Sequence, residues 1–274
     1  MNSVLARPIT RVPFVRRPQE PAHLLDYSID PENLSSKRAA RAFILEYSSL
    51  QKLKRCSSIY LKTQGSWNRC EHPLCSHCAR RRAYRLSAEL EDLARAFPVA
   101  LSLTLTLQST AGTALEAAWD ALDAVRTAFA GGRWLTTQVD AYRWHVELTR
   151  NADAWHPHLH LLLVSENEQD PAAVDSLRVA LIERWQAVAD RAGHYADPAG
   201  QHLDLIGRTR GRAIRYLAKG PMSQQKEEMT AGRIFSDAAH KGDADAAALW
   251  EEIERASEGR RWQGTGGVFR NSSR

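Results

Sequence analysis

The sequence predicts an α+β protein: an antiparallel β-sheet with helices on one face, preceded by a small helical segment that contains four cysteines. Three observations lead to this prediction. Val99–Gln108, VALSLTLTLQ, alternates apolar and polar residues as a half-buried strand does. Two further strand-like runs follow at 140–150 and 155–164, and long helical patterns flank them. A strand with one apolar face buries that face under helices and leaves the polar face available.

The bulk composition excludes a membrane-spanning protein and permits a nucleic-acid partner. The chain has 274 residues, enough for one large domain or two small ones, and its 43% hydrophobic content suffices for a core. The net charge of +5 is compatible with nucleic acid. No apolar stretch of about 18 residues is present, and the first residues lack the apolar core of a signal peptide. We therefore expect a cytoplasmic protein with no membrane partner.

The N-terminal third divides into an arm and a helical segment. Residues 1–33 hold five prolines and four arginines, and we expect a basic, disordered arm there. A helix is predicted from about 36 to 54, and a second over 79–97, where Pro98 stops it. The second helix opens on three arginines, which could reach DNA phosphates or form a solvated basic face: Arg80, Arg81 and Arg82.

The elements after the first strand follow from their caps and periodicity. A helix is predicted over 113–130, ended by a glycine pair, and another from Asp170 to about 192, with Asp170 as N-cap and Pro171 in the first turn. His202–Ile206 reads as a fourth strand. Residues 211–220, GRAIRYLAKG, predict a short basic helix, and the remainder predicts polar helices before a glycine-rich end.

Histidines alternate along the third strand, WHPHLHLLLV. Residues two apart share a face of a strand, so His158 and His160 point the same way. If this strand pairs with 140–150 as a hairpin, Glu147 lies beside them, and the first strand adds Thr104 and Thr106. Two imidazoles and a carboxylate are suited to a divalent metal with open positions. The alternative is a solvated polar face; His145 and His156 are weaker ligand candidates.

Tyr216 stands in a basic helix, and Lys219 lies one turn further on the same side. A phenol becomes a useful nucleophile when cations lower its pKa and the electrophile is polarised. The flanking Arg212 and Arg215 would also hold a DNA backbone. The alternative is a tyrosine that packs an amphipathic helix; the histidine strand favours the nucleophile.

The cysteines have the spacing C-x13-C-x4-C-x2-C. Four thiolates complete a tetrahedral structural zinc site, so we predict Zn²⁺ there. His72 and His77 could replace one cysteine, and four free thiols remain the alternative. A closed site of this kind would serve folding and DNA docking. The four predicted ligands are Cys56, Cys70, Cys75 and Cys78.

In this order, a threonine-rich strand, HPHLH and a Tyr-x-x-Lys helix resemble the three motifs of HUH endonucleases. The chain is most similar to rolling-circle replication initiator (Rep) proteins of small bacterial plasmids, over roughly residues 50–270. The upstream CSHCARRRA and the basic, glycine-containing C-terminal run fit the same family. The matching motifs are SLTLT, VELT, HPHLHLLLV and RYLAK.

The resemblance implies a chemistry and a domain plan. Mg²⁺ or Mn²⁺ on His158, His160 and Glu147 would polarise a phosphate of single-stranded origin DNA. Tyr216 would attack it, giving a 5′-phosphotyrosine and a free 3′-OH for a host polymerase, with a host helicase opening the duplex. Lys219 would orient phosphate or charge. The implied segments are the arm at 1–33, the cysteine segment at 34–96, the nuclease domain at 97–222 and a helical extension at 223–274.

The sequence departs from the family pattern at one position, and this leaves the residue that terminates the reaction unidentified. Some initiators carry a second tyrosine or a glutamate one turn before the nucleophile, where this chain has Arg212. Termination would use Glu227, Glu228 or the second subunit of a homodimer. A single-tyrosine transposase is a second reading, and a non-catalytic, zinc-dependent DNA-binding regulator is a third. Conjugative relaxases place their tyrosine before the histidines, which disfavours that branch.

Overall fold

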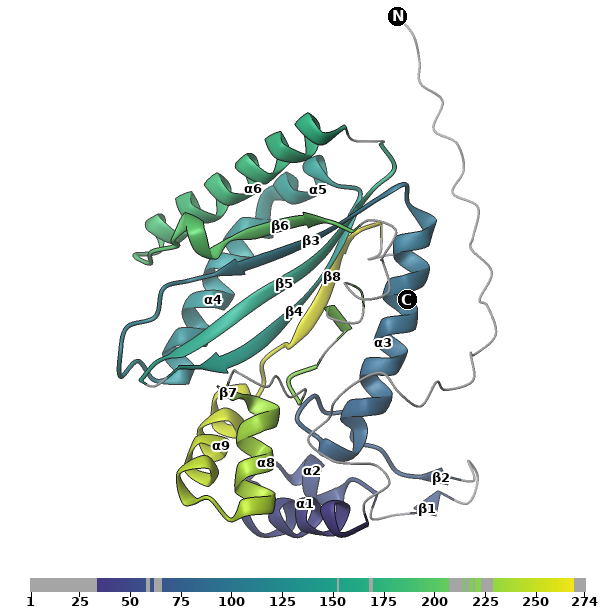
Figure 1. Ribbon diagram of the computed structural model, residues 1–274, viewed down its shortest axis with the longest axis vertical. Coiled ribbons are helices and arrows are strands. Elements are labelled where there is room, and N and C mark those ends of the chain that lie inside the picture. Colours follow the sequence, from purple (N-terminus) through teal and green to yellow (C-terminus); the bar gives the residue numbers. More distant parts are fainter. Residues whose placement is uncertain are drawn as a thin grey trace, which may run out of the picture.

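The computed structural model describes residues 34–57, 60–61, 66–151, 153–167, 170–206, 214, 217–218, 220–222 and 229–268. Its centre is a six-stranded antiparallel sheet with the strand order β6-β3-β5-β4-β7, and β8 pairs with β4 beside β7 (Figure 1). The α+β class and the antiparallel sheet predicted from the sequence are thus confirmed. The strands of this sheet are β3 (Val99–Thr106), β4 (Ala141–Arg150), β5 (Trp155–Ser165), β6 (His202–Leu205), β7 (Met229–Thr230) and β8 (Gln263–Gly267).

Helices cover the apolar face of this sheet, as predicted. The alternating leucines of β3 and β5 pack with the buried sides of α4 (Leu115–Ala130), α5 (Trp134–Gln138) and α6 (Pro171–Arg191). In Figure 1 α4 passes behind the sheet, and α6 runs along the edge formed by β6. The predicted N-cap of α6 is present, because Asp170 Oδ1 accepts a hydrogen bond from the backbone N–H of Ala173 at 2.7 Å.

The opposite face is partly covered by α3 (Ser76–Ala96), which follows the cysteines (Figure 1). Leu86, Leu90 and Ala94 of this helix pack against Leu162 and Val164 of β5. From the segment predicted as a basic helix, three residues are described as helical and buried in the same cluster: Ile214, Leu217 and Ala218. The face that carries the histidines is therefore apolar and covered at one end.

The N-terminal and C-terminal helices form one unit below the sheet (Figure 1). Helix α1 (Leu34–Tyr47) packs on α8 (Ala231–Lys241), which packs on α9 (Ala244–Ser257). The buried carboxylate of Glu254 accepts hydrogen bonds from Ser48 Oγ and from the Ser49 backbone N–H, both at 2.7 Å. The helix predicted over 36–54 is therefore divided into α1 and α2 (Gln51–Arg55). Between the two helices, Ser48 and Ser49 form hydrogen bonds with the Glu254 carboxylate.

Strand β8 was not predicted, because its sequence, QGTGG, has no strand propensity. The glycines are required by the aromatic residues paired with them on β4. A Cβ atom at Gly264 would lie 2.7 Å from Trp144 Nε1, and one at Gly266 would overlap the ring of Tyr142. Glycine at an edge covered by aromatic rings is a known way to complete a sheet.

Two further short strands, β1 (Tyr60–Leu61) and β2 (Ser66–Trp67), pair as a small antiparallel sheet between the first two cysteines. They also have no counterpart among the predicted elements. None of the described helices is both long and apolar enough to cross a membrane.

Candidate functional site

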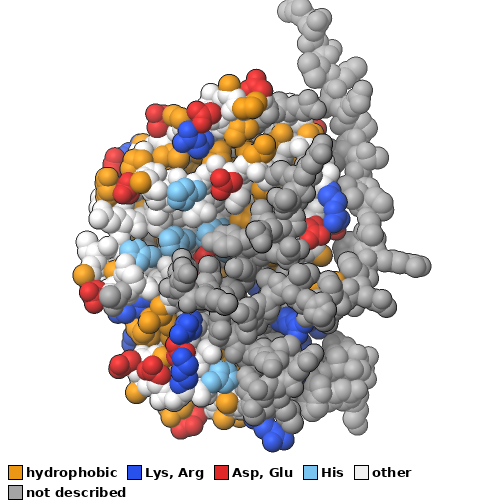
Figure 2. All heavy atoms as spheres, in the orientation of Figure 1, with side chains coloured by type: hydrophobic (Ala, Val, Ile, Leu, Met, Phe, Trp, Pro, Cys, Tyr) orange, Lys and Arg blue, Asp and Glu red, His pale blue; other side chains and the backbone are white. Residues whose placement is uncertain are grey.

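The pairing of β3, β4 and β5 brings the predicted polar groups onto one face. In the register of the sheet, Thr104 stands opposite His160 and Thr106 opposite His158. On the other side of β5, Glu147 stands opposite His158 and His145 opposite His160. The hairpin alignment expected from the sequence is therefore the one observed. Figure 2 shows histidine side chains gathered across this face of the molecule.

His160 is the most enclosed member of the group, at 2% exposed. Its Nε2 lies 2.8 Å from Glu147 Oε2, and its Nδ1 lies 3.1 Å from Thr104 Oγ1. An ionised carboxylate only accepts, so we assign the proton to Nε2. In a neutral ring, Nδ1 then accepts from the threonine hydroxyl. Two strands thus fix the orientation of this imidazole.

His158 is oriented by a threonine at the end of β4. Its Nε2 lies 3.0 Å from Thr149 Oγ1. The hydroxyl of Thr149 donates its hydrogen to the carbonyl oxygen of His156 at 3.2 Å, so Nε2 of His158 donates to Thr149. The rings of His158 and His160 are tilted to one another, with centroids 6.2 Å apart.

The electrostatics of the face favour neutral imidazoles and an ionised carboxylate. Burial lowers the pKa of His158 to about 4 and that of His145 to about 3. For Glu147, burial opposes ionisation, but the hydrogen bond from His160 and the electrostatic attraction of the neighbouring histidines together lower the pKa to about 2. At pH 7 this face therefore offers imidazole lone pairs and a negative oxygen, the donor set that a divalent cation needs.

The donor chemistry of His158, His160 and Glu147 fits a divalent metal, although their present geometry is that of a hydrogen-bonded network. Among the described residues, the group whose ligand atoms all lie within 4.8 Å of one another is the cysteine group, and the histidine face is not included. Metal binding would replace the bond between His160 and Glu147. The roles of these three residues remain predictions.

Two weaker candidates and one unexpected histidine complete the face. His145 stacks on His160, with ring centroids 5.0 Å apart and an interplanar angle of 22°. His156 has a buried Nε2 without a hydrogen-bond partner in the described structure. His202 of β6 stands opposite Thr104 and is exposed at the edge of the same face. No sequence pattern singled out His202, because the pairing of β6 with β3 depends on the tertiary fold.

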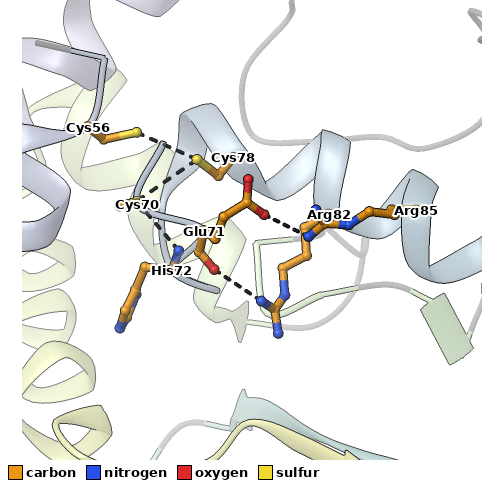
Figure 3. A network of polar contacts seen from close by, with 7 residues as sticks. All are labelled: Cys56, Cys70, Glu71, His72, Cys78, Arg82 and Arg85. Carbon is orange, nitrogen blue, oxygen red and sulfur yellow. Dashed lines mark hydrogen bonds and ion pairs between the residues drawn. The ribbon is translucent and has the colours of Figure 1, made fainter. Parts of the chain in front are cut away.

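The four cysteines come together as predicted. Their sulfur atoms all lie within 4.8 Å of one another, and Cys56 Sγ and Cys70 Sγ are 3.5 Å and 3.9 Å from Cys78 Sγ (Figure 3). Zinc–sulfur bonds of about 2.3 Å in a tetrahedron require sulfur–sulfur distances of roughly 3.8 Å. The cluster suits a metal, and His72 and His77 are not part of it.

The backbone around the cysteines is shaped to hold them. Ser57 and Glu71, which directly follow Cys56 and Cys70, both have positive φ angles, of 57° and 51°. Such strain in non-glycine residues persists where the surroundings fix it. The N–H of His72 points to Cys70 Sγ at 3.5 Å, and Cys75 directly precedes α3. The two last ligands are therefore positioned by the helix that also packs on the sheet.

The three predicted DNA-binding arginines of α3 point in different directions. Arg81 is exposed, whereas Arg80 and Arg82 are half-buried. Arg82 Nη1 donates to the carbonyl oxygen of Glu71 at 3.0 Å, and Arg85 forms an ion pair with the carboxylate of Glu71 at 2.7 Å (Figure 3). Arg82 thus faces inward, and Arg81 faces solvent.

The predicted nucleophile and its neighbours lie outside the described residues, as do the arm at 1–33 and the termination candidates Glu227 and Glu228. The affected residues in the predicted basic helix are Arg212, Arg215, Tyr216 and Lys219.

Residues 61–170 match the model of a protein family described as "Replication protein". Over these residues the chain resembles replication proteins. The matched range contains β3, β4 and β5 with Glu147, His158 and His160, as well as three of the cysteines, and it ends before Tyr216. It covers less than half of the chain. The match supports the resemblance to replication initiators that the motifs indicate.

Among curated proteins, none matches this chain significantly. One solved structure is a nuclease domain of non-structural protein 1 from minute virus of mice, which is 11% identical. The alignment covers 54% of this chain and 77% of that chain, with a TM-score of 0.23. A likeness this weak carries no argument about this chain.

Proposed function

We propose that this protein initiates rolling-circle replication of a plasmid by nicking single-stranded origin DNA. The observation that carries the proposal is the placement of His158, His160 and Glu147 on one face of an antiparallel sheet. The match to a replication-protein family spans these strands and favours an initiator over a transposase. Plasmid DNA lies in the cytoplasm, so we place the protein there.

In this proposal Tyr216 is the nucleophile. Its phenolic oxygen forms a bond to the phosphorus of the scissile phosphodiester, and the bond from phosphorus to O3′ breaks. The phenol loses a proton and the departing O3′ gains one, so the reaction consumes neither water nor an oxidant. The products are a 5′-phosphotyrosine and a free 3′-OH, which a host polymerase can extend after a helicase opens the duplex.

The sheet residues would hold and orient the phosphate. His158, His160 and Glu147 would hold Mg²⁺ or Mn²⁺, which when bound polarises a phosphoryl oxygen. Thr104 and Thr149 keep the two imidazoles in place through the hydrogen bonds described above. Lys219 would balance charge on the phosphate, and Arg212 and Arg215 would hold neighbouring phosphates.

The cysteine segment would bind structural Zn²⁺ and dock the DNA backbone. Residues 34–96 contain thirteen lysines and arginines against five acidic residues, whereas the net charge of the whole chain is +5. Positive charge is therefore concentrated in this segment, and Arg81 is exposed on it. Such a surface binds phosphates without regard to base sequence.

The experiment that tests the proposal detects the covalent intermediate. The protein is incubated with single-stranded oligonucleotides that tile both strands of an origin region, together with Mn²⁺, and resolved on a denaturing gel. We expect a slower protein band that carries DNA and is absent with Tyr216→Phe or a chelator. Binding without an adduct from any oligonucleotide would contradict the proposal and favour a non-catalytic DNA-binding regulator.

A further inference from the structure

The polar face of the sheet continues beyond the proposed metal ligands to the edge strand β6. His202 stands directly opposite Thr104, and Asp204 stands opposite Ser102. Residues that oppose each other in an antiparallel pair share a face, and Thr104 contacts His160 on that face. His202 and Asp204 therefore lie on the same side of the sheet as the proposed metal ligands.

Much of this face is closed to a substrate. Helix α3 covers one end of it, where Ala94 belongs to the same buried cluster as Val164 of β5. The same helix is tied to β4 by an ion pair between Arg143 and Glu89, with 2.9 Å between Nη1 and Oε2. Beside the histidines, Glu147 of β4 is only 8% exposed. A substrate therefore has little room over β4.

The open part of the face lies over β3 and β6. Ser102 and Thr104 are half-buried, whereas His202 and Asp204 are exposed. A DNA strand with one phosphate at the histidines can therefore extend across these two strands. Neighbouring strands are about 4.8 Å apart, so β6 lies roughly 10 Å from β5, within reach of a nucleotide beside the cleaved phosphate.

The two exposed side chains of β6 are available to such a nucleotide. Neither has a hydrogen-bond or ion-pair partner within the described ranges of the chain. They are two positions apart on one strand, which separates their Cα atoms by roughly 7 Å. An imidazole can stack on a base, and a carboxylate can accept a hydrogen bond from an amino group such as N4 of cytosine.

The carboxylate favours a base over a backbone phosphate. Asp204 would repel a phosphate, and the residues opposite the pair on β3, Ser102 and Thr104, carry no positive charge to offset the repulsion. A base with an exocyclic amino group meets the opposite situation, because its N–H groups can donate to the carboxylate.

We propose that His202 and Asp204 form a base-reading site for a nucleotide next to the cleaved phosphate, and that this site favours a base with an exocyclic amino group. His202 supplies a ring face, and Asp204 supplies the acceptor that distinguishes such a base from thymine. The inference rests on the proposed nicking function, which it extends from the cleaved phosphate to the sequence around it.

The test measures base preference as well as affinity. It starts from the single-stranded origin oligonucleotide that the full chain binds most tightly, and each position in turn is changed to each of the four bases. Dissociation constants are measured by fluorescence anisotropy without divalent metal, so that no cleavage occurs. We expect one position at which the preferred base carries an amino group and thymine binds about tenfold more weakly.

The variants separate the two roles. Asp204→Ala should reduce the difference between the bases at this position to about twofold or less. His202→Ala should weaken binding roughly tenfold, and this effect should disappear when the nucleotide at that position is abasic. Asp190→Ala removes an exposed carboxylate from α6 and is the matched control, because it changes the net charge equally and should keep the preference. Thermal unfolding of each variant checks that it is folded.

Three results would overturn the inference: a preference that survives in Asp204→Ala, a parent protein without such a position, or an effect of His202→Ala that persists on the abasic oligonucleotide. These measurements need no cleavage. A covalent adduct formed without any base preference would therefore remove only this site, whereas a base preference without an adduct would count against the nicking function alone.

Discussion

The cysteine cluster and the histidine face both gather potential metal ligands, but they differ in construction. The cysteines come from a short stretch of chain, and their sulfur atoms all lie within 4.8 Å of one another. The histidine face takes its groups from neighbouring strands, and those groups hydrogen-bond to one another and to threonines. Four thiolates fill every position of a tetrahedral metal, whereas two imidazoles and a carboxylate leave positions for a substrate.

Because of this difference, we expect the two regions to have different roles. The cysteine cluster joins a loop to the start of α3, and in our proposal the loss of a metal bound there would act first on folding. The histidine face is held by the sheet, with Leu159 and Leu161 buried on the reverse side. Loss of a ligand there would act first on catalysis. Four predictions, in decreasing order of effect, test this division.

His160→Ala should reduce nicking by about 10²-fold or more, because it removes a proposed metal ligand. The measurement is the initial rate of adduct formation at saturating Mn²⁺, with thermal unfolding as a check on folding. His194→Ala changes a histidine in the loop after α6 and serves as the control; it should nick at the parent rate. Comparable rates for His160→Ala and the parent would remove the histidine face from the mechanism.

Cys75→Ser should act on stability. Cys75 is 1% exposed and belongs to the four-thiol cluster, so its loss should cost about 4 kcal/mol and lower Tm by roughly 10 °C. Metal analysis should show one bound zinc per parent chain and none in the variant. A parent chain without zinc, together with an unchanged Tm in the variant, would show that the cysteines are free thiols; a variant that keeps its zinc would show that Cys75 is not a ligand.

Gly267→Ala should destabilise the edge strand β8, which pairs with the strand that bears Glu147. Gly267 has a φ of 68°, and a Cβ atom there would lie 2.7 Å from the Cα of Ala141. We expect a loss of roughly 2 kcal/mol from strain and overlap together. Gly112→Ala is the matched control, with a φ of 76° but open space around the new Cβ, so it carries strain alone. Equal losses in urea unfolding would show that β8 does not pack as described.

Asp170→Ala should have the smallest effect, because it removes an N-cap on the side of the sheet away from both regions. Loss of the 2.7 Å bond to the Ala173 N–H should cost about 1 kcal/mol and lower Tm by 2–4 °C. Nicking and zinc content should not change. A loss of nicking activity under conditions where the variant is still fully folded would show that the two faces of the sheet are coupled.

The sequence predicted the regular parts of the fold because its patterns are local. The alternation in Val99–Thr106 placed β3, and the Asp170–Pro171 pair placed the start of α6. The position of Glu147 beside the histidine pair followed from strand parity and the expected hairpin, since one wrong step in register would have moved every side chain to the other face.

Features that depend on distant contacts could not be predicted in this way. The break between α1 and α2 follows from Glu254, 206 positions away from Ser48. Strand β8 depends on Tyr142 and Trp144, whose rings occupy the space above its glycines. The inward turn of Arg82, in a run of three arginines, depends on the carbonyl of Glu71. In each case a tertiary contact outweighs local propensity.

Bound metal and nicking activity, followed in the same samples, separate the roles of the two regions. The parent protein is treated with a mild chelator, freed of it, and assayed with and without added Mn²⁺ while bound zinc is quantified by mass spectrometry. We predict that nicking is lost and returns with Mn²⁺, while one zinc per chain stays bound throughout. Nicking that persists without added metal, or that disappears only when the zinc leaves the cysteines, would contradict the division of work between the two regions.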